Sequence, residues 1–192
     1  MTAATPALPA RQRILDTACR LFYGEGLRAT GIDRIIAESG VAKMSFYRHF
    51  PSKNDLILAF LQLRHEAWMA RFTAAVEAAS AMRPGLAALA DALGNWFADA
   101  DYRGCAFINA VAESGVPATP EVGAIAARHK AELRDWIAAY AGRCDLREPE
   151  QAADEAMLVV EGMIVRFQMT RDATIPAHGR RLLELIAAAH RG

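Results

Sequence analysis

The sequence predicts an all-α protein, and three observations support this fold class. Alanine and other helix-favouring residues are abundant, and hydrophobic residues make up 53% of the 192-residue chain. Apolar residues recur at helical spacing along most of its length, and no stretch alternates polar and apolar residues as a half-buried strand would. Proline and glycine punctuate the periodic stretches. We therefore expect about nine helices, divided between residues 1–54 and residues 55–192.

The first predicted helix covers about residues 10–24, and its apolar face is formed by Ile14, Ala18, Leu21 and Phe22. The most informative stretch follows it: residues 26–53 have the sequence GLRATGIDRIIAESGVAKMSFYRHFPSK. Thr30 and Asp33 have the spacing of a capping box, so a short helix is expected to begin there.

Gly40 is a helix stop, and a second short helix follows it and buries Phe46. Its other side chains are basic and aromatic and point outward. Two short helices around a glycine turn are typical of a helix-turn-helix, whose second helix enters the DNA major groove.

Residues 40–56, GVAKMSFYRHFPSKNDL, resemble the TetR family of bacterial transcriptional regulators. The resemblance is dense over about residues 11–60, and over residues 61–192 it rests on length and helical pattern. It implies a three-helix N-terminal DNA-binding domain followed by a helical domain for ligand binding and dimerisation. The chain departs from the family's common residues at Gly31, Asp33, Ala42 and Met44, so a base preference cannot be transferred from a known member.

The resemblance and the outward face of the second short helix together imply a set of DNA contacts. Lys43, Met44 and Arg48 are expected to face base edges. The residues expected to hold phosphates are Thr30, Tyr47, His49 and Lys53, and Ser45 completes the predicted DNA-binding set.

The formal net charge is zero, but charge is distributed unevenly along the chain. Residues 1–54 hold eight basic and four acidic residues, whereas residues 55–192 hold 14 basic and 18 acidic ones. Positive charge is thus concentrated where the helix-turn-helix is predicted, which favours double-stranded DNA as a partner. No apolar run reaches transmembrane length, and no secretory signal is recognisable at the start of the chain. With three widely spaced cysteines, we expect a cytoplasmic protein with no membrane partner.

The rest of the chain is predicted to be helical. Helices are expected over about residues 52–79, from Pro84-Gly85 to about residue 98, and over about residues 104–113, 121–141, 150–170 and 176–190.

The last two helices are expected to form a homodimer. Residues 157–167, MLVVEGMIVRF, are apolar on more than one face, whereas a surface helix needs only one apolar stripe. The alternative is that this helix is the buried centre of a monomer. A dimer is favoured because two recognition helices about 34 Å apart can bind a palindrome. The predicted interface residues are Met157, Val160, Ile164, Leu182, Leu185 and Ile186.

The resemblance also implies a small-molecule pocket in the second domain. Its predicted wall residues are Phe60, Arg64, Trp68, Trp96, Cys105, Asn109, Glu113, His129, Trp136, Tyr140, Met163 and Phe167. Buried polar groups need partners, so Asn109, Glu113 and His129 either pair with one another or bind the ligand. The alternative is an ordinary aromatic core with a satisfied polar network.

Catalytic chemistry is not indicated. Cys105, Glu113 and His129 could be drawn as a metal site or a Cys-His pair, but they lack a diagnostic spacing, and no glycine motif for phosphate is present. We expect no enzyme activity, cofactor or metal. The predicted function is a dimeric repressor that binds a palindromic operator and is released by a small hydrophobic effector. The alternatives are a helical enzyme or carrier that retains the helix-turn-helix only structurally, and an architectural DNA-binding protein.

Overall fold

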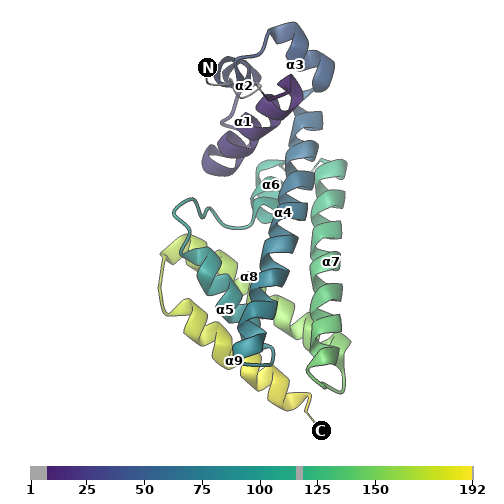
Figure 1. Ribbon diagram of the computed structural model, residues 1–192, viewed down its shortest axis with the longest axis vertical. Helices are drawn as coiled ribbons and strands as arrows, with labels where there is room; N and C mark the ends of the chain where they lie inside the picture. Colours follow the sequence, from purple (N-terminus) through teal and green to yellow (C-terminus); the bar gives the residue numbers. More distant parts are fainter. Residues whose placement is uncertain (1–7, 116–118, 192) are drawn as a thin grey trace, which may run out of the picture. The chain divides into compact units, whose positions relative to one another are not determined.

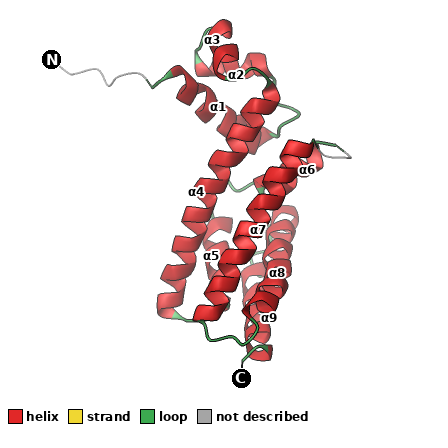
Figure 2. Ribbon diagram, turned by 90° about the vertical axis from the view of Figure 1, so that its right-hand side faces the viewer, coloured by secondary structure: helices red, strands yellow, loops and turns green. Residues whose placement is uncertain are grey.

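The computed structural model describes residues 8–115 and 119–191, and every regular element within them is a helix (Figure 2). This confirms the all-α prediction. The helices of these residues are α1 (Ala10–Glu25), α2 (Ile32–Ser39), α3 (Lys43–His49), α4 (Lys53–Met82), α5 (Ala87–Phe97), α6 (Ala106–Glu113), α7 (Pro120–Arg143), α8 (Pro149–Thr170) and α9 (Ile175–Ala189).

The chain divides into two compact units. The first comprises Met1–Arg64 and Asn109–Ile125, and the second comprises His65–Ile108 and Ala126–Gly192. The boundary in this part of the chain falls inside α4, between Arg64 and His65, whereas the sequence predicted one at residues 54 and 55, near the start of α4. The last part of α6 and the start of α7 belong to the first unit, although they follow the predicted DNA-binding segment by some fifty residues.

The first unit is organised around the buried side chains of α1, α2 and α3. Ile14, Leu21, Ile35 and Phe46 are each 0% exposed. Gly40 ends α2 in the left-handed conformation, at φ 63°, where a glycine carries no side-chain penalty. Removing water from these four apolar side chains stabilises each by roughly 1.5–3 kcal/mol, so the geometry of α2 and α3 is set mainly by this core.

The turn between α2 and α3 is also held from α1. The Arg13 Nη1 atom donates hydrogen bonds to the carbonyl oxygens of Ser39, at 3.0 Å, and Gly40, at 3.1 Å. These charge-assisted bonds satisfy carbonyl groups that the end of α2 leaves without helical partners.

Helix α4 begins with a capping box formed by Ser52 and Asp55. The Ser52 hydroxyl accepts a hydrogen bond from the Asp55 backbone N–H at 3.1 Å, and the Asp55 carboxylate accepts one from the Ser52 N–H at 2.9 Å. Asp55, three residues after the cap, completes the box. Its negative charge also interacts favourably with the positive N-terminal end of the helix dipole.

In the second unit, α5, α8 and α9 pack against one another (Figure 1). Gly179 of α9 is buried against Met163 of α8, and a Cβ atom at residue 179 would lie 2.0 Å from the Met163 Sδ atom. The Tyr102 hydroxyl donates a hydrogen bond to the Ile164 carbonyl at 2.8 Å. The absence of a side chain at residue 179 therefore allows the close approach of α8 and α9.

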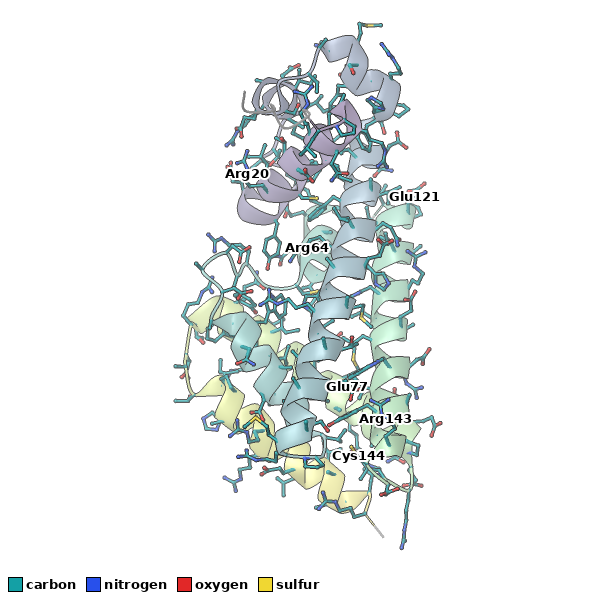
Figure 3. All side chains as sticks on the ribbon, viewed as in Figure 1. Arg20, Arg64, Glu77, Glu121, Arg143 and Cys144 are labelled. Carbon is teal, nitrogen blue, oxygen red and sulfur yellow. The ribbon has the colours of Figure 1, made fainter. Side chains whose placement is uncertain are left out.

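Helices α4 and α7 are joined near the end of α4. Arg143 and Glu77 form an ion pair there, and their side chains point toward each other in Figure 3. The buried Tyr140 hydroxyl lies 3.0 Å from both the Ser80 hydroxyl and the Gly85 carbonyl. These bonds satisfy the tyrosine, so it acts as a structural residue at this end of the unit.

Candidate nucleic-acid interface and effector site

The candidate nucleic-acid interface is the side of α3 that faces away from the core. Phe46 is 0% exposed, whereas Met44 is 77% and Tyr47 38% exposed, and Lys43 and Arg48 are exposed as well. Ser45 and His49 are half-buried. The described geometry therefore presents two cations, an aromatic ring and a thioether on one short helix, which suits contact with phosphates and base edges.

Two lysines, Lys43 and Lys53, lie at the edges of this face. The Lys43 ammonium lies 3.3 Å from the Asp33 carboxylate in an exposed pair, which holds it only weakly. Lys53 is half-buried, and burial lowers its pKa, while the nearby Glu113 carboxylate opposes that shift. Both ammonium groups remain accessible to an anion.

The Thr30 side chain does not belong to this surface. Thr30 is 0% exposed, and its hydroxyl donates a hydrogen bond to the Gly26 carbonyl at 2.8 Å. Residue 31 rather than Thr30 is the N-cap of α2, and it makes no side-chain capping bond. The predicted capping box and the predicted phosphate contact by the Thr30 hydroxyl are therefore both wrong.

Replacing Thr30 with Val is expected to lower the free energy of unfolding by about 1–3 kcal/mol, because the Gly26 carbonyl loses a partner inside the protein. Thr170→Val is the matched control, since the Thr170 hydroxyl makes the same kind of bond at an exposed site. Urea unfolding followed by circular dichroism would measure both. Equal, small effects for the two variants would contradict this role of Thr30.

Two arginines near α2 are engaged with acids rather than free for phosphate. Arg34 binds Glu25 and Glu38, and Arg20 also binds Glu38. The hydrogen bond from Arg34 holds the pKa of the Glu25 carboxyl below its usual range, and the bond from Arg20 is the main cause of the same shift in Glu38. All four side chains are substantially exposed, so the network orients this surface more than it stabilises the fold.

Glu113 was predicted to line the effector pocket, but it binds the loop after α1. Its carboxylate accepts a hydrogen bond from the Arg28 backbone N–H at 2.9 Å, and it lies against Gly26, where a Cβ atom would be 3.0 Å from Glu113 Oε2. Glu113 belongs to the first unit and His129 to the second. The Glu113 carboxylate thus has its own partner within the first unit, and a ligand role for His129 stays a prediction.

Other predicted wall residues also belong to the first unit. Phe60 is 1% exposed and packs edge-on against Phe22, with ring centroids 5.6 Å apart. The Arg64 guanidinium lies 3.9 Å from the centre of the Tyr23 ring. Phe60 and Arg64 thus serve the packing of the first unit, and the structure also places Asn109 there.

The remaining predicted wall residues lie in the second unit, where most join an aromatic cluster. Trp68 stacks on Phe72 at 4.7 Å and meets Trp96 edge-on at 5.5 Å. Trp136 continues the cluster through Phe72 and stacks on Tyr140, and Phe167 stacks on Phe97 at 4.4 Å. Cys105 is buried, and Met163 is buried against Gly179.

His129 is the polar centre of this cluster. It is 2% exposed, stacks on Phe107 at 3.8 Å and meets Trp68 edge-on at 5.4 Å. Burial lowers the pKa of His129 to about 3, helped by the charges of Lys130 and His65. The ring is therefore neutral near pH 7 and can donate or accept a hydrogen bond without carrying charge.

Sequence reasoning missed the partner of His129. The Nδ1 atoms of His65 and His129 lie 3.1 Å apart, and the His65 Nε2 atom lies 3.0 Å from the Glu132 carboxylate. Residues 65 and 129 are 64 positions apart, and only the helical phase of α4 and α7 could have suggested the pair. Across the described residues, no group of three or more potential ligands could hold a metal ion.

Two cavities adjoin the aromatic cluster. The smaller, about 30 Å³, is lined by Trp68, Phe72 and Trp96 among others, so the tryptophans largely fill the space between them. The larger is an open groove of about 600 Å³ between α4, α5 and α9, with Arg83, Asp91 and Arg180 as its charged residues. Ala75 and Asn95 line both, which makes the groove and the cluster neighbours.

Three of the predicted interface residues are buried within the chain. Met157, Val160 and Ile164 are 8%, 0% and 2% exposed, so they belong to the core of the second unit rather than to its surface. The alternative, that this helix is the buried centre of a monomer, accounts for these three side chains, but Leu158 of the same helix is 74% exposed. Leu182 and Leu185 are 49% and 58% exposed, and Ile186 is half-buried, so these remain candidates for an interface.

The fold and the exposed face of α3 define a helix-turn-helix DNA-binding protein, and comparisons with known proteins agree. Residues 14–60 match the bacterial regulatory proteins of the tetR family. The chain is 31% identical to the HTH-type transcriptional regulator LmrA of Bacillus subtilis, over 80% of this chain and 81% of LmrA. The protein therefore belongs to the TetR family of transcriptional regulators.

Solved structures show the same fold along the chain. SCO4454, a TetR-family transcriptional regulator from Streptomyces coelicolor, is 30% identical with a TM-score of 0.80, covering 95% of this chain and 96% of that one. The multidrug binding protein EbrR, solved with malachite green, is 24% identical with a TM-score of 0.71, covering 92% and 96%. Within the described parts of the chain, none of the helices has the length and apolarity needed to cross a bilayer.

Proposed function

We propose that this regulator is a dimeric repressor of the bacterial cytoplasm that binds a palindromic DNA operator and releases it when a small apolar effector binds. The observation that carries the proposal is the outward face of α3, where Met44 and Arg48 lie opposite the buried Phe46. One such helix contacts only a few base pairs, so a two-fold pair is needed for a specific operator.

The proposed dimer interface is an outer stripe on α8 and α9. On α8 the stripe has helical spacing, and its residues are exposed or half-buried: Leu158, Gly162, Val165 and Met169. On α9 it continues with Leu182, Leu185, Ile186 and Ala189. Leu158 and Met169 are 74% and 78% exposed, and apolar side chains gathered in this way favour burial against a second copy. Because α8 and α9 pack together, two copies would form a four-helix bundle.

The proposed effector site is the aromatic cluster of the second unit. Trp68 and Trp96 supply apolar area, and the neutral His129 ring supplies one orienting polar group. The cavity at the cluster is too small for an effector, so Trp68 has to move aside on binding. The neighbouring groove offers a path to the aromatic cluster past Ala75 and Asn95, which line both the groove and the small cavity.

The test begins with selection of bound DNA from a random pool by the purified full-length protein. Compounds are then screened for release of the selected operator. We expect a palindrome, and at least one apolar compound that weakens DNA binding; by linkage, the operator must weaken binding of that compound by the same factor. An enzyme or carrier would select no sequence. An architectural protein would bind DNA without responding to any compound.

Arg48→Ala and Lys53→Ala are expected to weaken operator binding in different ways. Arg48 lies at the centre of the outward face, so its loss should cost about 1–3 kcal/mol and relax the preference at one base position. Lys53 lies at the start of α4, so its loss should weaken all sequences alike and lower the salt slope by about one unit. Titrations of operator mutants at several salt concentrations measure both. Identical profiles for the two variants would contradict this division of roles.

A further inference from the structure

Met44 occupies the position on α3 where a side chain is directed most fully away from the protein. In an α-helix, residues two positions before and after a given residue point to the opposite side, so Met44 and Arg48 both lie opposite Phe46. Phe46 is 0% exposed and Met44 is 77% exposed. Met44 and Arg48 are also four residues apart, the spacing that places two side chains side by side.

The chemistry of methionine limits what Met44 can recognise. Its thioether has no hydrogen-bond donor and is only a weak acceptor, so it cannot distinguish bases by their donor and acceptor pattern. The apolar feature on the edge of an unmodified base pair in the major groove is the C5 methyl group of thymine. A flexible, polarisable side chain suits contact with that methyl group.

We propose that Met44 packs against a thymine methyl group in each half-site of the operator, beside the base pair that Arg48 contacts. The inference rests on the proposed function and names part of its DNA substrate. Arginine pairs best with guanine, and base pairs are stacked about 3.4 Å apart. Because the two side chains are neighbours on one helix face, the thymine and the guanine should lie within about two base steps of each other.

The test replaces single thymines of the selected operator with deoxyuridine, which removes the methyl group and leaves every hydrogen-bonding group in place. At one position per half-site, we expect affinity to fall about fourfold for one replacement and about fifteenfold for both, from the loss of one buried methyl group each time. In Met44→Ala, thymine and uracil at that position should bind equally well.

Two controls separate this contact from general weakening. Arg48→Ala should retain the difference between thymine and uracil although its overall affinity falls. Met44→Leu keeps an apolar side chain of similar size and should retain most of the difference. The inference is overturned if no thymine shows the effect, or if the effect persists unchanged in Met44→Ala. Failure of the full-length protein to select any sequence would instead overturn the proposed function.

Discussion

Val160→Asp is expected to unfold the second unit rather than separate a folded dimer. Val160 lies on the buried face of α8 and is 0% exposed, so the new carboxylate would be buried without a partner. Such a charge costs about 3–5 kcal/mol, a large part of the 5–15 kcal/mol that typically holds a folded protein together. Loss of helical circular dichroism signal at 25 °C, or a much lower urea midpoint, would measure it.

Leu158→Asp is the matched variant, two residues away on the same helix. Leu158 is 74% exposed, so the charge stays in water within one chain and becomes buried only in the proposed dimer. We expect a folded monomer whose operator affinity falls by on the order of a hundredfold or more, because two linked recognition helices bind far better than one. Sedimentation equilibrium and an operator titration test this. A folded Val160→Asp monomer together with a dimeric Leu158→Asp would reverse the assignment of the two helix faces.

Acidification is expected to destabilise the folded protein partly through His129. The folded pKa of His129 is lowered to about 3, while its ordinary value is 6.5. Between these values the unfolded chain binds the proton and the folded chain does not. Stability from this group is therefore complete above about pH 6.5 and declines as pH falls toward 3, by about 3 kcal/mol at pH 4.

The difference in the free energy of unfolding between wild type and His129→Gln, followed with pH, isolates the contribution of His129. Glutamine can still donate to the His65 Nδ1 atom, which lies 3.1 Å from the His129 Nδ1 atom, but it does not titrate. The acidic groups that also titrate below pH 5 are common to both proteins and cancel in the difference. Urea unfolding at pH 7, 5.5 and 4 should show wild type losing more stability than the variant. Parallel losses would mean that His129 is readily protonated in the folded state.

The helices were predictable because their signals are local. The Gly40 stop acts within one helical turn, and the apolar spacing of Ile14, Ala18 and Leu21 within two, and the structure confirms both. The prediction that Thr30 caps α2 was wrong because residues 30 and 31 could each begin this helix. The Thr30 hydroxyl instead donates its hydrogen bond to the Gly26 carbonyl.

The errors in the predicted site residues arose where the sequence does not show which side of a helix packs against the rest of the protein. Residues 157–167 are apolar on more than one side, and sequence periodicity cannot say that Val160 faces the core while Leu158 faces solvent. Glu113 was misplaced because its partner, the Arg28 backbone N–H, lies 85 residues away and has no side-chain signature. Most of the residues predicted to contact DNA, in contrast, lie on one short helix, where the buried Phe46 fixes the direction of the others.

The contact between Gly179 and Met163 has a consequence for the descent of this chain. A Cβ atom at residue 179 would come within 2.0 Å of the Met163 sulfur, so a larger residue at position 179 requires the Met163 side chain to shift or to be replaced. Among close relatives, a larger residue at the position of Gly179 should appear only together with a shorter one at the position of Met163. Because α8 and α9 carry the proposed outer stripe, we expect lineages that alter this contact to pair less well with the ancestral form in the proposed dimer.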